Sequence, residues 1–163
     1  MITQRSSLAS LFALGLGCAP LVPATAFAVD TKIVPATVCL PSGTNYFSTE
    51  DGVFNNSSTS ALTLRCPILR DNTTSKPNSI KVSVKDNSAT IGVTCRVRNV
   101  GFDASGIFSG ADVTSSGTGI KILTLPLPTV FPTNALYTVT CTIPATPSGQ
   151  AASGVRGIIY EEP

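Results

Sequence analysis

The feature that most constrains this chain is the position of its cysteines within stretches that alternate between apolar and polar residues. In the stretches 62–68, 91–97 and 137–143, every second residue is apolar. One apolar position in each stretch is a cysteine, namely Cys66, Cys95 and Cys141. Successive side chains of a β-strand point to opposite faces of a sheet, so these cysteines belong to the face that packs in a core. The alternation is typical of antiparallel sheets with one buried face.

The same pattern extends over much of the chain and predicts an all-β domain. No stretch has the apolar spacing of an amphipathic helix, and valine, isoleucine and threonine are frequent. About eight or nine short strands in one domain are typical of a single antiparallel β-sandwich, either immunoglobulin-like or jelly-roll-like. The clearest strand candidates are 61–68, 81–85, 91–98, 120–125 and 137–143; weaker candidates are 36–40, 52–55, 106–108 and 155–160.

The N-terminal segment predicts export. Arg5 precedes an apolar stretch at 8–17, and the segment ends in Ala26-Phe27-Ala28, the small-x-small pattern of a signal-peptidase site. The stretch is shorter than the roughly 20 residues of a permanent membrane span. We therefore expect a cleavable signal peptide at 1–28 and a β-sandwich domain at 29–163, in the periplasm or secreted. The alternative is an outer-membrane lipoprotein modified at Cys18.

Four cysteines remain after that segment: Cys39, Cys66, Cys95 and Cys141. An even number in an exported chain predicts two disulfides, because the compartment is oxidising. Of three possible connectivities, local pairing favours Cys39–Cys66 with Cys95–Cys141. We expect these bonds to link the core faces of opposed strands, as in two-sheet sandwiches. A zinc site is disfavoured, since no close cysteine pair and no histidine are present.

Composition excludes several classes of function. The 163 residues include no histidine and no tryptophan, and only 12% are charged, with a formal net charge of +2. A Ser-His-Asp triad and an imidazole metal site are therefore impossible. The charge is also too small to hold a nucleic-acid backbone. We assign no catalytic, cofactor-binding or metal-binding residue, and we expect no enzyme, no nucleic-acid partner and no membrane span.

The acidic residues do not form an evident catalytic pair. Two pairs are adjacent in sequence, Glu50–Asp51 and Glu161–Glu162. Neighbouring residues of a strand point to opposite faces, so solvated acids are expected instead of a hydrolase dyad. Acids in or near loops are the ligands that calcium prefers, but they lack a calcium-loop pattern. These loop acids are Asp71, Asp86, Asp103 and Asp112.

The basic residues are few. Arg96 and Arg98 share the outward face of one strand, while Arg65 and Arg70 lie elsewhere in the sequence. We interpret Arg96 and Arg98 as a solvated face, not as an anion site.

The stretches 52–58 (Gly-Val-Phe-Asn-Asn-Ser-Ser) and 64–73 (Leu-Arg-Cys-Pro-Ile-Leu-Arg-Asp-Asn-Thr) together resemble a loose group of small exported bacterial proteins of unknown function. Members share an Asn-Asn-Ser step, then Cys-Pro-x-x-Arg-Asp-Asn, then two further cysteines in strands. The resemblance implies a bacterial origin and a four-cysteine β framework, and it transfers no site. Within the motif, Arg70 and Asp71 are expected to form a structural ion pair.

Three functional hypotheses follow. The favoured one is an exported, non-enzymatic structural or interaction module whose ligand is unknown. The alternative is a carbohydrate- or surface-binding β-sandwich module, because such sandwiches often carry sites in their end loops. A hydrolase using loop carboxylates such as Glu50 and Asp71 is the least favoured. The expected partner is a protein or a cell-surface glycan.

Overall fold

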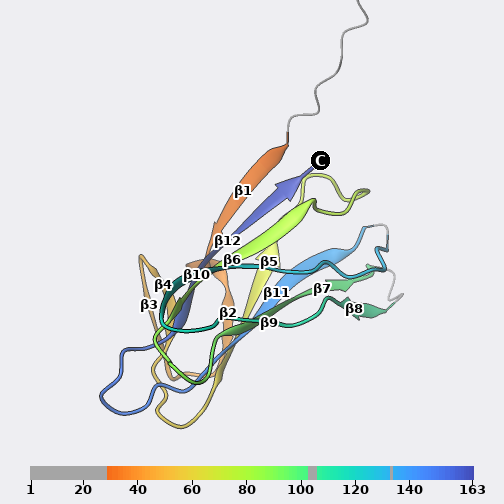
Figure 1. Ribbon diagram of the computed structural model, residues 1–163. Coiled ribbons are helices and arrows are strands. Elements are labelled where there is room, and N and C mark those ends of the chain that lie inside the picture. Colours follow the sequence, from red (N-terminus) through yellow and green to blue (C-terminus); the bar gives the residue numbers. More distant parts are fainter. Residues whose placement is uncertain (1–28, 103–105, 133) are drawn as a thin grey trace, which may run out of the picture.

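The computed structural model describes residues 29–102, 106–132 and 134–163. The predicted signal peptide at 1–28 lies outside this part of the chain. The described residues form two antiparallel sheets that pack face to face, with one short 3-10 turn (Figure 1). This arrangement confirms the predicted β-sandwich. In the same residues, no helix has the length and apolar character that a membrane crossing would require.

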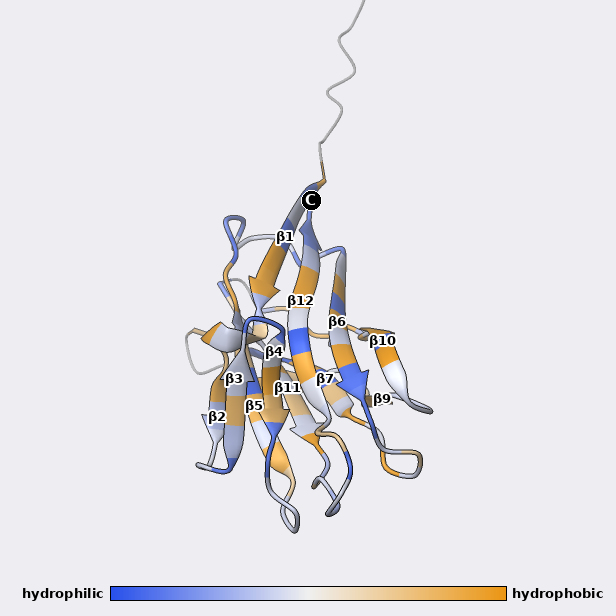
Figure 2. Cartoon of the chain, turned by 90° about the vertical axis from the view of Figure 1, so that its left-hand side faces the viewer, coloured by the Kyte–Doolittle hydropathy of each residue, from blue (hydrophilic) through white to orange (hydrophobic). Residues whose placement is uncertain are grey.

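Sheet I contains the strands in the order β10-β6-β12-β4-β3, which Figure 2 shows side by side. β12 is its centre: it pairs with β6 along one side, and with both β1 and β4 along the other. A register shift around Arg156 bulges β12 between its contacts with β4 and β1. The bounds are β1 (Asp30–Pro35), β3 (Tyr46–Thr49), β4 (Gly52–Asn55), β6 (Ser79–Asp86), β10 (Gly119–Thr124) and β12 (Gly154–Glu162).

Sheet II contains the strands in the order β2-β5-β11-β7-β8, and the two-residue strand β9 also pairs with β7. Its bounds are β2 (Leu40–Ser42), β5 (Leu62–Ile68), β7 (Thr94–Val100), β8 (Ile107–Ser109), β9 (Val113–Thr114) and β11 (Leu136–Ile143). The 3-10 turn η1 (Ala36–Val38) carries the chain from β1 of sheet I to β2 of sheet II.

The core lies between the inward faces of the two sheets. Every second residue of β5, β6, β7 and β11 is buried, which is the alternation that the sequence predicted. Each fully buried valine, leucine or isoleucine contributes about 1.5–3 kcal/mol relative to an exposed one. Core side chains with no exposed surface are Ala36, Leu64, Cys66, Ile80, Val82, Val84, Val93, Val97, Val139, Cys141, Ile143, Val155 and Ile158.

Both disulfides form as favoured, Cys39–Cys66 and Cys95–Cys141. The expectation that they link opposed sheets is wrong. Cys95 lies directly opposite Cys141 on the neighbouring strands β7 and β11 of sheet II. Cys39 immediately precedes β2, which pairs with the strand of Cys66. Alternation shows that a cysteine faces the core, but not whether its partner lies across the core or on the next strand. The Cα–Cα separations, 4.2 and 4.1 Å, suit narrow antiparallel pairs.

Most predicted strands are confirmed, with ends shifted by a few residues. Two predictions are wrong in part. In stretch 36–40 only Leu40 lies in a strand, and 36–38 form a 3-10 turn, because the chain crosses there between the sheets. β7 begins only at Thr94, because the Val93 N–H donates to Ser115 Oγ at 2.8 Å instead of to a ladder partner. Strands β1, β3 and β9 were not predicted; β3 and β9 are too short to display alternation.

A buried asparagine fastens the two sheets together at one end of the sandwich. Asn55, the last residue of β4, has no exposed surface. Its Nδ2 donates to the carbonyls of Ser60, Ile143 and Pro144 at 2.9, 3.2 and 2.9 Å. Its Oδ1 accepts the N–H of Ser57 at 2.9 Å. The Asn55 side chain therefore stabilises the turn that follows β4.

Candidate functional site

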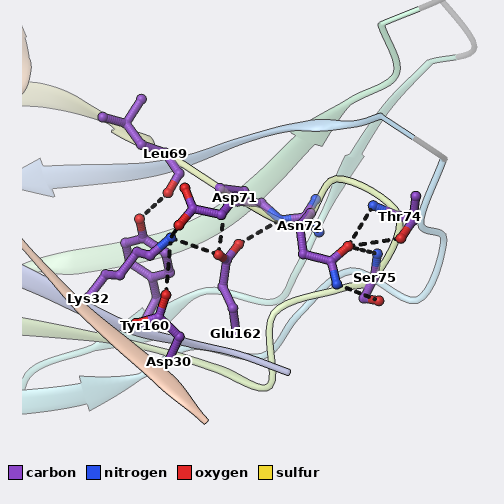
Figure 3. Close-up of polar contacts among 10 residues, drawn as sticks. Asp30, Lys32, Leu69, Asp71, Asn72, Thr74, Ser75, Tyr160 and Glu162 are labelled. Carbon is purple, nitrogen blue, oxygen red and sulfur yellow. Dashed lines mark hydrogen bonds and ion pairs between the residues drawn. The ribbon is translucent and has the colours of Figure 1, made fainter. Parts of the chain in front are cut away.

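Charged side chains gather where β1 runs beside the last residues of β12 (Figure 3). The register places Asp30 opposite Glu162, and the segment after β5 brings two further charges against them. We call Asp30, Lys32, Arg70, Asp71 and Glu162 the β1–β12 cluster. Two of its members are buried: the side chain of Glu162 is 3% exposed and that of Arg70 is 5% exposed.

Glu162 is the centre of this cluster. The Lys32 Nζ lies 2.9 Å from Glu162 Oε2, and the Arg70 Nε lies 3.4 Å from Glu162 Oε1. The backbone N–H of Asp71 also donates to Glu162 Oε2, at 3.0 Å. Nearby, the Tyr160 hydroxyl donates to the carbonyl of Leu69. A buried carboxylate is thus matched by two cations and a backbone donor, as burial of a charge requires.

These contacts determine the protonation of the cluster. Burial by itself would raise the pKa of Glu162. The hydrogen bonds from Lys32 and from the Asp71 N–H, together with the charges of Lys32 and Arg70, outweigh burial and hold this pKa below its ordinary value of 4.5. The hydrogen bond to Asp71, with the contribution of Glu162, raises the pKa of Lys32. The pair is therefore ionised at neutral pH.

The same geometry shows what occupies the space between the acids. Carboxylate oxygens of Asp30, Asp71 and Glu162 lie within 4.8 Å of one another. The Lys32 ammonium is among them, 3.5 Å from Asp30 Oδ2 and 2.6 Å from Asp71 Oδ2. A lysine therefore provides the positive charge that balances these acids. We interpret the β1–β12 cluster as structural: its ion pairs hold β1, β12 and the segment after β5 together.

Several sequence-based expectations for charged residues need correction. Arg70 and Asp71 do not pair with each other: Arg70 contacts Glu162, and Asp71 contacts Lys32. Glu161 and Glu162 do point to opposite faces, but Glu162 is not solvated. Sequence reasoning missed the cluster because its members are distant in the chain and charge alone does not reveal burial.

The other loop acids are dispersed. Asp86 is buried and accepts the Ser115 hydroxyl at 2.5 Å and the Ser88 N–H at 3.0 Å. Asp112 pairs with Arg96, with Nε–Oδ1 at 2.7 Å. Asp103 lies outside the described residues. Glu50 and Asp51 form the tip of the β3–β4 hairpin, where Asp51 Oδ1 lies 3.5 Å from Arg156 Nη2.

A hollow of about 270 Å³ lies over β3 and β4 on the outer face of sheet I. Phe47 and Phe54 are opposite each other in register, and their rings stack at 5.2 Å with an interplanar angle of 15°. Phe47 is 40% exposed, whereas Phe54 is 5% exposed. We call this the Phe47 hollow; the residues that line it are Phe47, Thr49, Asp51, Phe54, Lys85, Asn87, Ala151 and Ala152.

A glycine of β12 leaves room for the ring of Phe54. Gly154 of β12 is the register partner of Phe54. A Cβ at Gly154 would lie 2.4 Å from Cδ1 of Phe54 and 2.5 Å from the carbonyl oxygen of Val53. The ring and the neighbouring backbone therefore leave no space for a side chain there. The sequence did not reveal this site, because the stacking of Phe47 on Phe54 depends on the register of β3 with β4.

The outer face of sheet II carries a second hollow, also of about 270 Å³. The sequence placed Arg65 apart from Arg96 and Arg98, but the sheet brings all three to one surface, because β11 separates β5 from β7 by a single strand. Arg70 is not part of it. We call this surface the arginine–threonine trough; its lining is Thr63, Arg65, Thr94, Arg96, Arg98, Thr140 and Thr142.

No protein-family model and no curated protein matches the sequence. Among solved structures, the fold is similar to that of a xylan-binding module, CBM15, with a TM-score of 0.55 and 11% identity over 82% of this chain and 97% of that one. The CBM36-1 domain of a multidomain xylanase from the hindgut metagenome of Trinervitermes trinervoides aligns with a TM-score of 0.47 and 12% identity, over 82% of this chain and 98% of that one. At such identities the likeness to CBM15 concerns the fold alone: this chain has a β-sandwich of the kind that a xylan-binding module also uses.

Proposed function

We propose that this protein is a non-catalytic carbohydrate-binding module and that the Phe47 hollow takes the sugar. The observation that carries the proposal is an exposed aromatic ring, stacked on a second ring and bordered by polar side chains. Ligand sites combine an apolar or aromatic surface with a few polar groups that orient the ligand. This function replaces an unspecified structural or interaction role as our favoured hypothesis, because the hollow has the features of a ligand site.

The chemistry of the hollow suits a sugar. The C–H face of a pyranose ring can pack on Phe47, which Phe54 supports from behind. Asp51, Lys85 and Asn87 offer carboxylate, ammonium and amide groups to the hydroxyls at the edge of the ring. The volume is near the lower end of small-molecule sites, about 300 Å³, which suits a short segment of a glycan.

The lining supports binding without catalysis. Glycoside hydrolysis generally uses two carboxyl groups on either side of the scissile bond. Among the described residues that line the hollow, Asp51 is the one carboxylate, and it is paired with Arg156. Glu50, its neighbour at the hairpin tip, is not in the lining. The loop-carboxylate hydrolase therefore gains no support from this site.

Replacing Phe47 by alanine is expected to weaken glycan binding at least tenfold. The reason is the loss of the exposed stacking surface, for which about 1.4 kcal/mol corresponds to a factor of ten. An array of neutral oligosaccharides, including xylo-oligosaccharides, would identify a ligand, and titration calorimetry would give its affinity for both proteins.

The matched control for this test is Tyr46→Ala. Tyr46 is the preceding residue of β3, and it is 38% exposed against 40% for Phe47. Its side chain points to the other side of the strand, so its removal should leave affinity unchanged. An array without any bound oligosaccharide would contradict the proposal, as would equal losses in the two variants.

We also propose that the domain acts outside the cytoplasm after cleavage behind Ala28. The support is the pair of disulfides, which persist in oxidising compartments. The expected result is an intact mass, measured on protein from its native envelope, that corresponds to a chain starting at Val29 with four oxidised cysteines. A mass that starts at a lipid-modified Cys18 would favour the lipoprotein alternative.

A further inference from the structure

The arginine–threonine trough is built by strand register. Thr140 of β11 lies opposite Arg65 of β5 and also opposite Arg96 of β7. The two arginines are therefore two strand spacings apart, about 10 Å between backbones, with a threonine hydroxyl between them. The neighbouring row is entirely threonine, with Thr142 opposite Thr63 and Thr94. Cationic groups thus lie beside a row of hydroxyls on one open surface.

Acidic side chains balance only part of the charge of this surface. Arg96 forms a two-pronged pair with Asp112, with nitrogen–oxygen distances of 2.7 and 2.8 Å. Arg98 Nε donates to the Ser109 hydroxyl at 3.4 Å, and a hydroxyl carries no charge to balance the guanidinium. Within the part of the chain that the structure describes, the ion pairs include neither Arg65 nor Arg98. Two guanidinium charges are therefore available to a ligand.

We propose that the trough is a second binding site and that its ligand is an acidic polysaccharide, whose carboxylates pair with Arg65 and Arg98. A guanidinium group binds a carboxylate through two parallel hydrogen bonds, which adds both strength and orientation. The threonine hydroxyls can donate to and accept from the hydroxyls of the sugar rings. The site lies on the opposite face of the sandwich from the Phe47 hollow, and it does not depend on that site.

The trough suits a polysaccharide better than a nucleic acid. Proteins that hold single strands usually stack bases on aromatic side chains, and no aromatic residue is in the lining. Duplex binding needs a larger cationic field than a chain of net charge +2 provides. The sequence indicated only that Arg96 and Arg98 share one face of a single strand, which we interpreted as solvated. The register of the sheet places Arg65, from a second strand, on the same surface.

The test is affinity electrophoresis and calorimetry of the full domain with polygalacturonate, at about 50 mM salt. The double variant Arg65→Gln/Arg98→Gln should bind at least tenfold more weakly. The matched control is Lys81→Gln/Lys121→Gln, which removes the same charge from sheet I, outside both hollows. This control and Phe47→Ala should both retain the affinity of the unaltered protein. Circular dichroism and melting curves would verify that each variant is folded.

Each other outcome has a definite meaning. No binding of polygalacturonate, or an equal loss in the lysine control, would overturn the proposal. So would equal binding of a neutral glycan or tighter binding of single-stranded DNA. Displacement of polygalacturonate by equimolar inorganic phosphate would assign the trough to free oxyanions and overturn the polysaccharide assignment. Because the variants lie on opposite faces, loss of binding in Arg65→Gln/Arg98→Gln but not in Phe47→Ala would support the trough even if the Phe47 hollow binds no sugar.

Discussion

Replacing both Cys95 and Cys141 by alanine is expected to lower the free energy of unfolding by about 4 kcal/mol. The disulfide closes a loop of 46 residues, and its removal returns the corresponding conformational entropy to the unfolded chain. The two sulfur atoms also lie in the core, where the cysteines are 1% and 0% exposed, so the shorter side chains lose packing as well. Urea unfolding followed by circular dichroism would measure the change.

The second disulfide provides the comparison. The Cys39→Ala/Cys66→Ala variant opens a loop of 27 residues, for which the same entropy argument gives about 3.5 kcal/mol. Both variants should retain their strands, because the ladder between β7 and β11 and that between β2 and β5 remain. Adding a reductant to the unaltered protein should lower its stability as well. A loss below about 1 kcal/mol in the Cys95→Ala/Cys141→Ala variant would contradict this account of sheet II.

The Glu162→Gln variant is expected to lose about 3 kcal/mol of stability. The amide cannot balance the charges of Lys32 and Arg70, and removal of one partner from a buried ion pair typically costs 3–5 kcal/mol. The matched control is Glu161→Gln on the outer face of sheet I. There Glu161 Oε1 lies 3.8 Å from Nζ of the partly exposed Lys81. That surface pair should contribute no more than about 0.5 kcal/mol.

The same residue predicts how stability depends on acidity. The pKa of Glu162 is lower in the folded protein than its ordinary value of 4.5, so the unfolded chain binds more protons in the interval between the two values. The contribution of Glu162 is therefore complete above about pH 4.5 and is lost as the pH falls through the folded-state value. Denaturant midpoints between pH 7 and pH 3 should decline less steeply for Glu162→Gln. Parallel declines in the variant and the unaltered protein would refute this role.

The sequence was informative where a residue's environment follows from its immediate neighbours. Alternation predicted which residues of β5, β6 and β11 are buried, and it placed three cysteines on the core face. The hydrogen bonds of Asn72 are local as well: its Oδ1 accepts the N–H groups of Thr74 and Ser75, which is common for an Asn in a turn.

The sequence did not predict the environment of residues whose contacts come from distant segments of the chain. Glu162 was expected to be solvated, and its burial arises from Lys32, which is 130 residues away in the chain. Arg65 and Arg96 share a surface only because β11 lies between their strands. Phe54 is covered by Phe47 only because the β3–β4 hairpin places them in register. Neither alternation nor composition specifies which strands are neighbours, and both candidate sites depend on that order.

The arrangement of β1 beside β12 has a mechanical consequence. The strands run antiparallel, with Asp30 opposite Glu162 and Pro35 opposite Gly157. A tension applied between residues 30 and 162 would act across the strands, in the direction of their backbone hydrogen bonds, and would load those bonds one after another instead of together. The contact between Lys32 and Glu162 would be among the first to carry the load. β1 would then separate from β12 one residue pair at a time. The strands of sheet II, which the two disulfides link, would stay in place.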